Sequence, residues 1–71
     1  MSLIFTHHAL LRMKLRRVSE AMVRDTMQHP DKRGLGYGGK LLAFRSYTAG
    51  LLKVVYVKEN EDYVVITVIW E

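Results

Sequence analysis

The side chains best suited to chemistry lie in a row near the start of the chain. His8, Arg12 and Arg16 are spaced four residues apart in a segment rich in leucine, and this spacing aligns them along one side of a helix. Cleavage of RNA without a metal ion needs a group that exchanges a proton near neutral pH, which imidazole does. It also needs positive charge beside the phosphorane that forms when a ribose 2′-OH attacks its own phosphate, and a guanidinium supplies that charge. The alternative interpretation is a solvated basic face with a structural histidine.

Two other patterns suggest a bound metal or cofactor, and both fail on their context. His7 and His8 are adjacent and point about 100° apart on a helix, so they cannot readily hold one ion. Residues 34–40 read GLGYGGK, which matches a dinucleotide-binding pattern and most of a P-loop. Both motifs need a strand before the glycines and a helix after them, whereas here a helix precedes and a strand follows. We therefore expect neither a metal ion nor a cofactor.

The charge of the chain favours a negatively charged partner. The 71 residues carry a formal net charge of +4 at pH 7. Residues 1–53 hold ten of the eleven Lys and Arg but only three of the seven Asp and Glu, so the positive charge is concentrated there. A basic body attracts nucleic acid or an acidic protein, although many small basic domains bind neither.

Composition also bears on the compartment. The chain has no cysteine, which excludes a disulfide framework and thiolate metal ligands and is compatible with a reducing cytoplasm. Residues 1–10 lack the basic and long apolar segments of a signal peptide. No apolar run reaches the roughly 18 residues that a membrane helix requires. We expect a cytoplasmic protein with no membrane contact.

The pattern of the chain predicts a single α+β domain that spans all 71 residues. Thr6 is placed to cap a helix that runs to about Arg17. Ser19 is placed to cap a second helix, and Pro30 ends it.

The rest of the chain predicts a β-meander. Residues 31–39 contain four of the five glycines and predict a loop or a weak strand. Runs rich in Val, Ile, Tyr and Thr follow at residues 40–47, 51–58 and 63–70. We expect two N-terminal helices packed on a three- to four-stranded antiparallel sheet.

The turns of the meander predict which residues share a sheet face. We place two-residue turns at Ala49-Gly50 and Asn60-Glu61. One nearly apolar face should then receive the helices, and it holds Leu42, Phe44, Val55, Val57, Val64, Ile66 and Val68. The other face is expected to be open and mixed, with Arg45, Tyr47, Val54, Tyr56, Lys58, Tyr63, Val65 and Thr67. Tyrosine rings on an open face can stack on RNA bases, and a solvated sheet face is the alternative.

The start of the chain resembles a known family. Residues 5–13 read FTHHALLRM and are followed by Arg16, which resembles the opening motif of the domain-of-unknown-function family 4258. In that family a Phe-Thr-x-His-Ala-x-x-Arg-Met helix precedes a second helix, a proline and a β-meander. The family is placed in the barnase–EndoU–colicin–RelE superfamily of small metal-independent ribonucleases, many of which are bacterial toxins. The resemblance implies a RelE-like fold and implicates His8, Arg12 and, on the last strand, Thr67, with Arg16 as a weaker match.

These observations predict an endoribonuclease toxin of a bacterial toxin–antitoxin pair. His8 is expected to transfer the proton, Arg12 to stabilise the phosphate, and Thr67 to orient a phosphate oxygen or the histidine. The residues expected to bind RNA are Arg16, Arg45, Tyr47 and Tyr56. An acidic antitoxin would neutralise the basic body, and the last strand, as an exposed edge, would allow a homodimer. The alternative is a non-catalytic module of the same fold that binds RNA or a protein.

Overall fold

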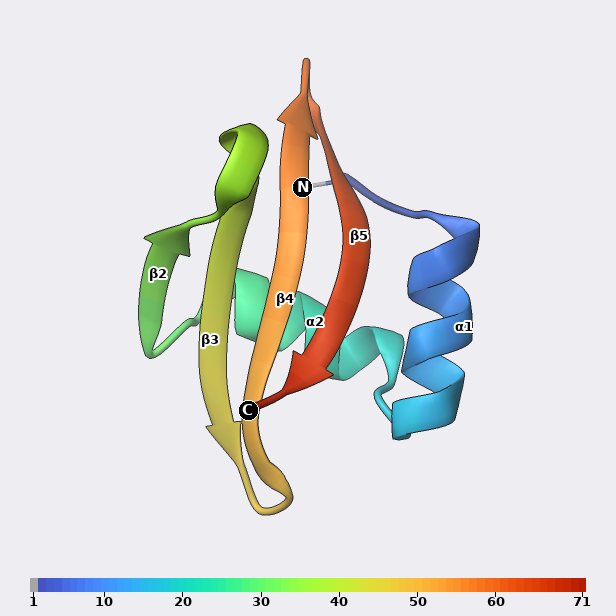
Figure 1. Ribbon diagram of the computed structural model, residues 1–71, viewed down its shortest axis with the longest axis vertical. Helices are drawn as coiled ribbons and strands as arrows, with labels where there is room; N and C mark the ends of the chain where they lie inside the picture. Colours follow the sequence, from blue (N-terminus) through green and yellow to red (C-terminus); the bar gives the residue numbers. More distant parts are fainter. Residues whose placement is uncertain (1) are drawn as a thin grey trace.

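Two helices and five strands make up the computed structural model, which describes residues 2–71 (Figure 1). A short 3-10 turn, η1, joins the second strand to the third. In chain order the elements are β1 (Ser2–Phe5), α1 (His7–Arg16), α2 (Glu20–Gln28), β2 (Lys32–Leu35), η1 (Tyr37–Gly39), β3 (Leu41–Tyr47), β4 (Gly50–Glu59) and β5 (Asp62–Trp70). The predicted α+β class with two N-terminal helices is confirmed.

The strands form one sheet in the order β1-β5-β4-β3-β2. Strands β2 to β5 are antiparallel neighbours in chain order, as predicted for a meander. β1 lies parallel to β5, with Phe5 opposite Val65. The sheet of residues 2–71 is therefore mixed and has five strands, where three or four antiparallel strands were expected. A parallel pair needs a long connection between its strands, and the two helices with the meander supply it.

Side-chain caps start both helices at the predicted residues. The Thr6 hydroxyl accepts a hydrogen bond from the backbone N–H of Ala9 at 3.0 Å, and the Ser19 hydroxyl accepts one from that of Met22 at 3.1 Å. Each cap satisfies an N–H that has no partner within the first helical turn. α1 ends where Arg17 takes a left-handed conformation with φ of 57°. Neither helix of residues 2–71 has the length and apolar run that crossing a membrane requires.

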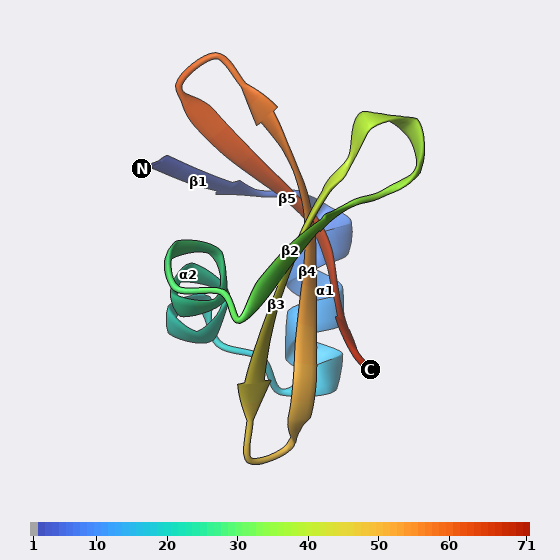
Figure 2. The same cartoon turned by 90° about the vertical axis from the view of Figure 1, so that its left-hand side faces the viewer.

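Both helices cover the sheet face that was expected to be open. Ala43, Val54 and Val68 form a cross-strand row in which each residue is 0% exposed. They pack in one core with Ala9 of α1 and Val23 of α2. α2 lies behind β3 and β4, and α1 lies beside β5 (Figure 1, Figure 2). The predicted assignment of the two faces is therefore wrong.

Polar side chains on the covered face explain why it can be buried. Arg45 on β3 donates to the carbonyl of His29, and the Tyr47 hydroxyl donates to that of Met22 at 3.0 Å. Both side chains bury their apolar parts under α2 and satisfy their polar ends on its backbone. The opposite face, to which Phe44 belongs, is more apolar but carries no helix of residues 2–71.

The first hairpin turns one residue earlier than predicted, which shifts its cross-strand pairs by two residues. Its turn is Thr48-Ala49, with Tyr47 opposite Gly50, where Ala49-Gly50 was expected. Because side chains alternate with a period of two, this shift changes the cross-strand partners but leaves the same residues together on each face.

The second hairpin contains a β-bulge that moves two residues between faces. Its turn, Asn60-Glu61, is as predicted. Farther along, Tyr56 pairs with Val65 but Val55 pairs with Thr67, so Ile66 is an extra residue on β5. The extra residue reverses the alternation beyond it. Val68 consequently enters the core, and Thr67 lies on the opposite face with Val55.

β1 and α1 occupy the edge of β5 that was expected to be exposed. β1 pairs with residues 62–65 of β5. Beyond them, Thr6 Oγ1 donates to the carbonyl of Ile66 at 3.2 Å, and Arg16 Nη1 donates to that of Val68 at 2.7 Å. These carbonyls are the acceptors that a partner strand would need. The expectation that β5 is an exposed edge is therefore wrong, since the edge strands are β1 and β2. A homodimer through an edge strand stays a prediction.

Candidate functional site

His8 and Arg12 form a hydrogen-bonded pair on the surface of α1. Arg12 Nε donates to His8 Nε2 over 3.4 Å, one helical turn away. The adjacent side of the helix buries Ala9 and Met13 in the core, which fixes the orientation of the pair. His8 is exposed and Arg12 is partly exposed, so both can contact a ligand from solvent.

The direction of this hydrogen bond defines which nitrogen of the imidazole is available. Arg12 Nε is the donor and His8 Nε2 is the acceptor in this contact. A contact of 3.4 Å is long for a hydrogen bond and costs little to break. The one ion pair within residues 2–71 joins Lys53 to Glu71, so no carboxylate among them neutralises Arg12.

Arg16 continues the row but also holds the fold together. Its Nη1 donates to the carbonyl of Val68 at 2.7 Å, and the indole N–H of Trp70 donates to the Arg16 carbonyl at 2.9 Å. The last turn of α1 is thus fastened to the end of β5 by two bonds in opposite directions. A guanidinium has five N–H donors, so a contact between Arg16 and RNA through the others stays a prediction.

Thr67 lies in the stretch of β5 to which α1 is attached. Its neighbours on either side accept the hydrogen bonds from α1 described above. The bulge turns Thr67 to the face of Val55, and none of the hydrogen bonds within residues 2–71 joins it to His8 or Arg12. The structure therefore brings His8, Arg12 and Arg16 together but leaves Thr67 without a direct bond to the pair.

The other predicted RNA ligands lie on the face that the helices cover. Tyr56 is 4% exposed, and its hydroxyl accepts a hydrogen bond from Arg33 Nη1 at 3.1 Å. Tyr47 and Arg45 bond to the backbone of α2 and its C-terminus. The expectation that Arg45, Tyr47 and Tyr56 lie on an open sheet face is therefore wrong, because the helices cover that face. That these residues bind RNA stays a prediction.

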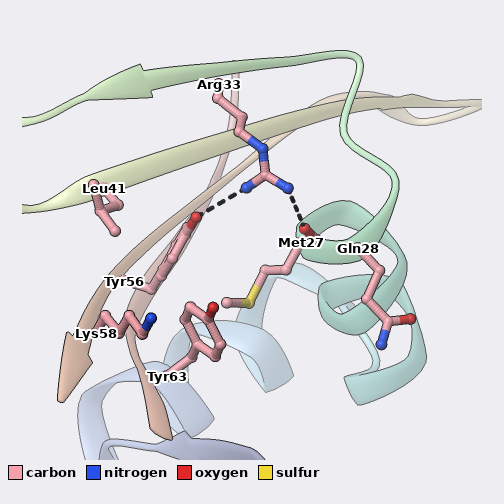
Figure 3. Close-up of a pocket in the computed structure, with 7 residues that line it drawn as sticks. All are labelled: Met27, Gln28, Arg33, Leu41, Tyr56, Lys58 and Tyr63. Atoms are coloured by element: carbon pink, nitrogen blue, oxygen red, sulfur yellow. Dashed lines mark hydrogen bonds between the residues drawn. The ribbon is translucent and has the colours of Figure 1, made fainter. Parts of the chain in front are cut away.

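A hollow of about 410 Å³ opens at the C-terminal end of α2 (Figure 3). Polar groups from β2, β4 and β5 meet here, and the sequence reasoning did not identify them as a site. Lys58 and Tyr63 are cross-strand partners, which the predicted second turn implies. Arg33 lies in the segment that predicted a loop, so nothing in the sequence placed it beside them. The hollow is lined by Met27, Gln28, Arg33, Leu41, Tyr56, Lys58 and Tyr63.

Metal ligands are not grouped in the part of the chain that the structure describes. Among residues 2–71, no three His, Asp or Glu side chains are close enough together to hold a metal ion.

Comparisons with known proteins identify the family of the chain. Neither the curated proteins nor the solved structures give a significant match. The model of a family described as a domain of unknown function (DUF4258) matches residues 5–70. This span includes both helices and strands β2 to β5 in full, and the predicted family is confirmed. The chain belongs to the DUF4258 family.

Proposed function

We propose that this protein is a metal-independent endoribonuclease that acts as the toxin of a bacterial toxin–antitoxin pair. The contact of 3.4 Å between Arg12 Nε and His8 Nε2 on an exposed helical turn carries the proposal. An imidazole and a guanidinium at this separation can contact one phosphodiester together. Imidazole exchanges protons near neutral pH, and the planar guanidinium matches two phosphate oxygens at once.

In the proposed reaction, His8 Nε2 takes the proton of a ribose 2′-OH. The 2′ oxygen attacks the adjacent phosphorus, and Arg12 stabilises the charge of the phosphorane. The bond from phosphorus to the 5′ oxygen of the next nucleotide then breaks, and that oxygen receives a proton from the imidazolium or from water. The products are a 2′,3′-cyclic phosphate and a 5′-hydroxyl. Each step uses only side chains of this chain, the RNA and water.

Two further residues support the pair in this proposal. Arg16 fastens α1 to β5 through the carbonyl of Val68, which prevents the helix from turning the pair away from its position. Thr67 lies on the same attached stretch of β5 with its side chain on the face of Val55, and in this proposal its hydroxyl orients a phosphate oxygen where the bound RNA reaches that face.

The charge of the chain supports an RNA substrate and an acidic inhibitor. Positive charge is concentrated in residues 1–53, and neutralising phosphates is the main source of affinity for nucleic acids. The α1 motif resembles that of the DUF4258 family, whose placement in a superfamily of small ribonucleases points the same way. An acidic antitoxin in the cytoplasm would compete with RNA for the same positive charge.

Cleavage of RNA in the presence of EDTA by His8→Ala and His7→Ala variants tests the proposal. His7 and His8 are adjacent and exposed, so each variant removes one imidazole from the same helical turn. We expect His8→Ala to lose about 100-fold or more of the activity, which is the usual contribution of a general base. His7→Ala should retain it. Both variants should unfold at nearly the wild-type temperature, because surface substitutions change stability little.

An RNA substrate that lacks the attacking hydroxyl provides the control. RNA with a single 2′-deoxyribose at the cleavage position should resist cleavage there, since the attacking hydroxyl is missing. A folded His8→Ala variant that cleaves as fast as His7→Ala would refute the proposal. So would a wild-type activity that EDTA abolishes.

A non-catalytic RNA-binding module is the second candidate. It is favoured by the use of Arg16, Arg45 and Tyr56 to hold the fold together, which leaves few groups to assist the chemistry. Such a module would retard RNA on a native gel. Wild-type protein and His8→Ala would then bind RNA equally, and neither would cut it.

A further inference from the structure

The hollow at the C-terminal end of α2 lies apart from the pair on α1. α2 ends at Gln28, and the chain then turns through Pro30 into β2, so α2 stops short of the far end of the sheet (Figure 1). Leu41 and Tyr56, which are cross-strand partners, lie on the helix-covered face at this end. Neither His8 nor Arg12 lines the hollow, which makes it distinct from the site on α1.

Hydrogen-bond donors dominate this hollow. Arg33 Nη1 donates to the Tyr56 hydroxyl and Nη2 to the carbonyl of Met27, each at 3.1 Å (Figure 3). These two bonds orient the guanidinium and leave three of its five N–H groups for a ligand. The Tyr56 hydroxyl accepts from Arg33, so it can donate its own proton. The Lys58 ammonium adds three more donors.

Within residues 2–71, no carboxylate forms an ion pair with these positive groups. The residues that line the hollow include Arg33 and Lys58 but no Asp or Glu. The ion pair between Lys53 and Glu71, the one within residues 2–71, involves neither of them. Two cations that border a hollow without an acidic partner favour an anion as the occupant.

Aromatic and apolar side chains form the remaining wall. The rings of Tyr56 and Tyr63 lie edge to face, with centroids 5.8 Å apart and planes at 64°. Leu41 and Met27 complete the lining. Tyr56 is buried and supports the ring of Tyr63, which is partly exposed and provides surface on which a nucleic-acid base can stack. The volume of about 410 Å³ falls in the range of sites for small organic ligands, so the lining suits an anion attached to a flat ring.

We propose that this hollow binds a phosphorylated nucleoside, with the phosphate on Arg33 and Lys58 and the base against the partly exposed ring of Tyr63. This proposal rests on the proposed ribonuclease function, because the RNA substrate would supply the nucleotide. The hollow would hold one nucleotide of the RNA strand, while a different part of the strand is cleaved at His8 and Arg12. A free nucleotide has the same chemistry and is the alternative source.

Titration of nitrogen-15-labelled protein with adenosine 5′-monophosphate, followed by NMR, measures this binding. We expect saturable shifts at the backbone amides of Lys58 and Tyr63. Adenosine alone and inorganic phosphate alone should each bind more weakly, because each contacts only part of the hollow. A 2′-O-methyl tetranucleotide, which cannot be cleaved, is titrated in parallel. Tighter binding of the tetranucleotide identifies RNA as the source, and tighter binding of the mononucleotide identifies the free nucleotide.

Lys58→Gln and Lys32→Gln form a matched pair for this titration. Each lysine is an exposed strand residue whose Nζ lies near the ring of its cross-strand partner, at 5.8 Å from the Tyr63 centroid for Lys58 and 4.7 Å from the Phe44 centroid for Lys32. Lys32 lies on the opposite face of the sheet. We expect Lys58→Gln to raise the Kd about tenfold, as loss of a charged hydrogen bond does. Lys32→Gln should leave the Kd within about twofold, as expected for a distant, screened charge.

Arg33→Gln tests the guanidinium in the same way. Arg33 also donates to the carbonyl of Met27, so the Arg33→Gln substitution can lower stability as well as binding. A thermal unfolding curve of this variant shows whether it folds. If it does not fold, Lys58→Gln provides the test. The inference is overturned if adenosine 5′-monophosphate does not saturate the protein. It is also overturned if Lys32→Gln weakens binding as much as Lys58→Gln, or if an oligoglutamate peptide binds as tightly as the nucleotide.

The two sites can fail separately. His8→Ala should lose RNA cleavage but bind adenosine 5′-monophosphate like the wild type, because His8 does not line the hollow. Nucleotide binding that depends on Lys58, in a protein that cuts no RNA, would refute the proposed function alone. RNA cleavage without nucleotide binding in the hollow would refute this inference alone.

Discussion

Arg12 Nε lies 3.4 Å from His8 Nε2 across one turn of α1. The helix that carries this pair is attached to β5 at both ends, through the side chains of Thr6 at its start and Arg16 in its last turn. Reactive groups held on a rigid element keep their relative positions better than groups on loops. The geometry of the pair is therefore set by the helix, and the position of the helix is set by β5.

Arg12→Ala should lower RNA cleavage far more than Lys14→Ala. Each variant removes one positive charge from α1, but only Arg12 contacts His8. We expect kcat to fall by about 100-fold or more for Arg12→Ala, as on removal of a donor that stabilises the transition state, and to stay near the wild-type value for Lys14→Ala. A fluorogenic oligoribonucleotide measures both. Equal losses in the two variants would mean that Arg12 acts only through net charge.

Thr6→Ala should destabilise the protein more than Ser19→Ala. Both hydroxyls cap a helix, but the Thr6 hydroxyl also donates to the carbonyl of Ile66 at 3.2 Å. Loss of a cap costs about 1 kcal/mol of unfolding free energy, and loss of a second hydrogen bond adds about 1 kcal/mol. Urea unfolding measures the difference. A Ser19→Ala variant as unstable as Thr6→Ala would show that the bond to β5 contributes nothing.

Arg16→Ala should be less stable than Arg24→Ala. Arg16 donates to the carbonyl of Val68 at 2.7 Å in a partly buried position, whereas Arg24 is an exposed residue of α2. We expect Arg16→Ala to lose about 1–2 kcal/mol of unfolding free energy, as for a hydrogen bond to a charged group. Arg24→Ala should stay within about 0.5 kcal/mol of the wild type. Equal stability of the two variants in urea would contradict this structural role of Arg16.

Tyr47→Phe should reduce stability without reducing the cleavage activity of the folded protein. The Tyr47 hydroxyl lies 3.0 Å from both Thr26 Oγ1 and the carbonyl of Met22, so its removal should cost about 1 kcal/mol. Tyr37→Phe is the matched control, because Tyr37 is 95% exposed and its hydroxyl faces solvent. Thermal unfolding and RNA cleavage are measured on both variants. A loss of activity confined to Tyr47→Phe, with unchanged stability, would support the prediction that Tyr47 binds RNA.

The helices and the row on α1 were predictable because the interactions that define them are local. A cap joins residues three positions apart, as Thr6 and Ala9 are, and a helical row depends only on a spacing of four. The second turn of the meander, at Asn60-Glu61, is local in the same sense. These features follow from neighbouring residues whatever the rest of the chain does.

The sheet faces were predicted wrongly for a different reason. Alternation groups residues correctly within β3 and β4, but it does not say which group the helices cover. That choice depends on bonds between distant residues, such as the one from Tyr47 to Met22. The bulge at Ile66 adds a second long-range effect, because one extra residue places Val68 in the core and Thr67 outside it.

The sequence by itself therefore determined the α+β class, the family, the two capped helices and the alignment of His8 with Arg12. Only the tertiary structure decided that β1 lies beside β5, that α2 covers the face of Tyr47, and that Arg33 lines a hollow rich in hydrogen-bond donors. Periodicity and capping act over about four residues and can be read in order along the chain. The covered face and the hollow depend on which distant segments pack together, and that is set by the free energy of the whole fold.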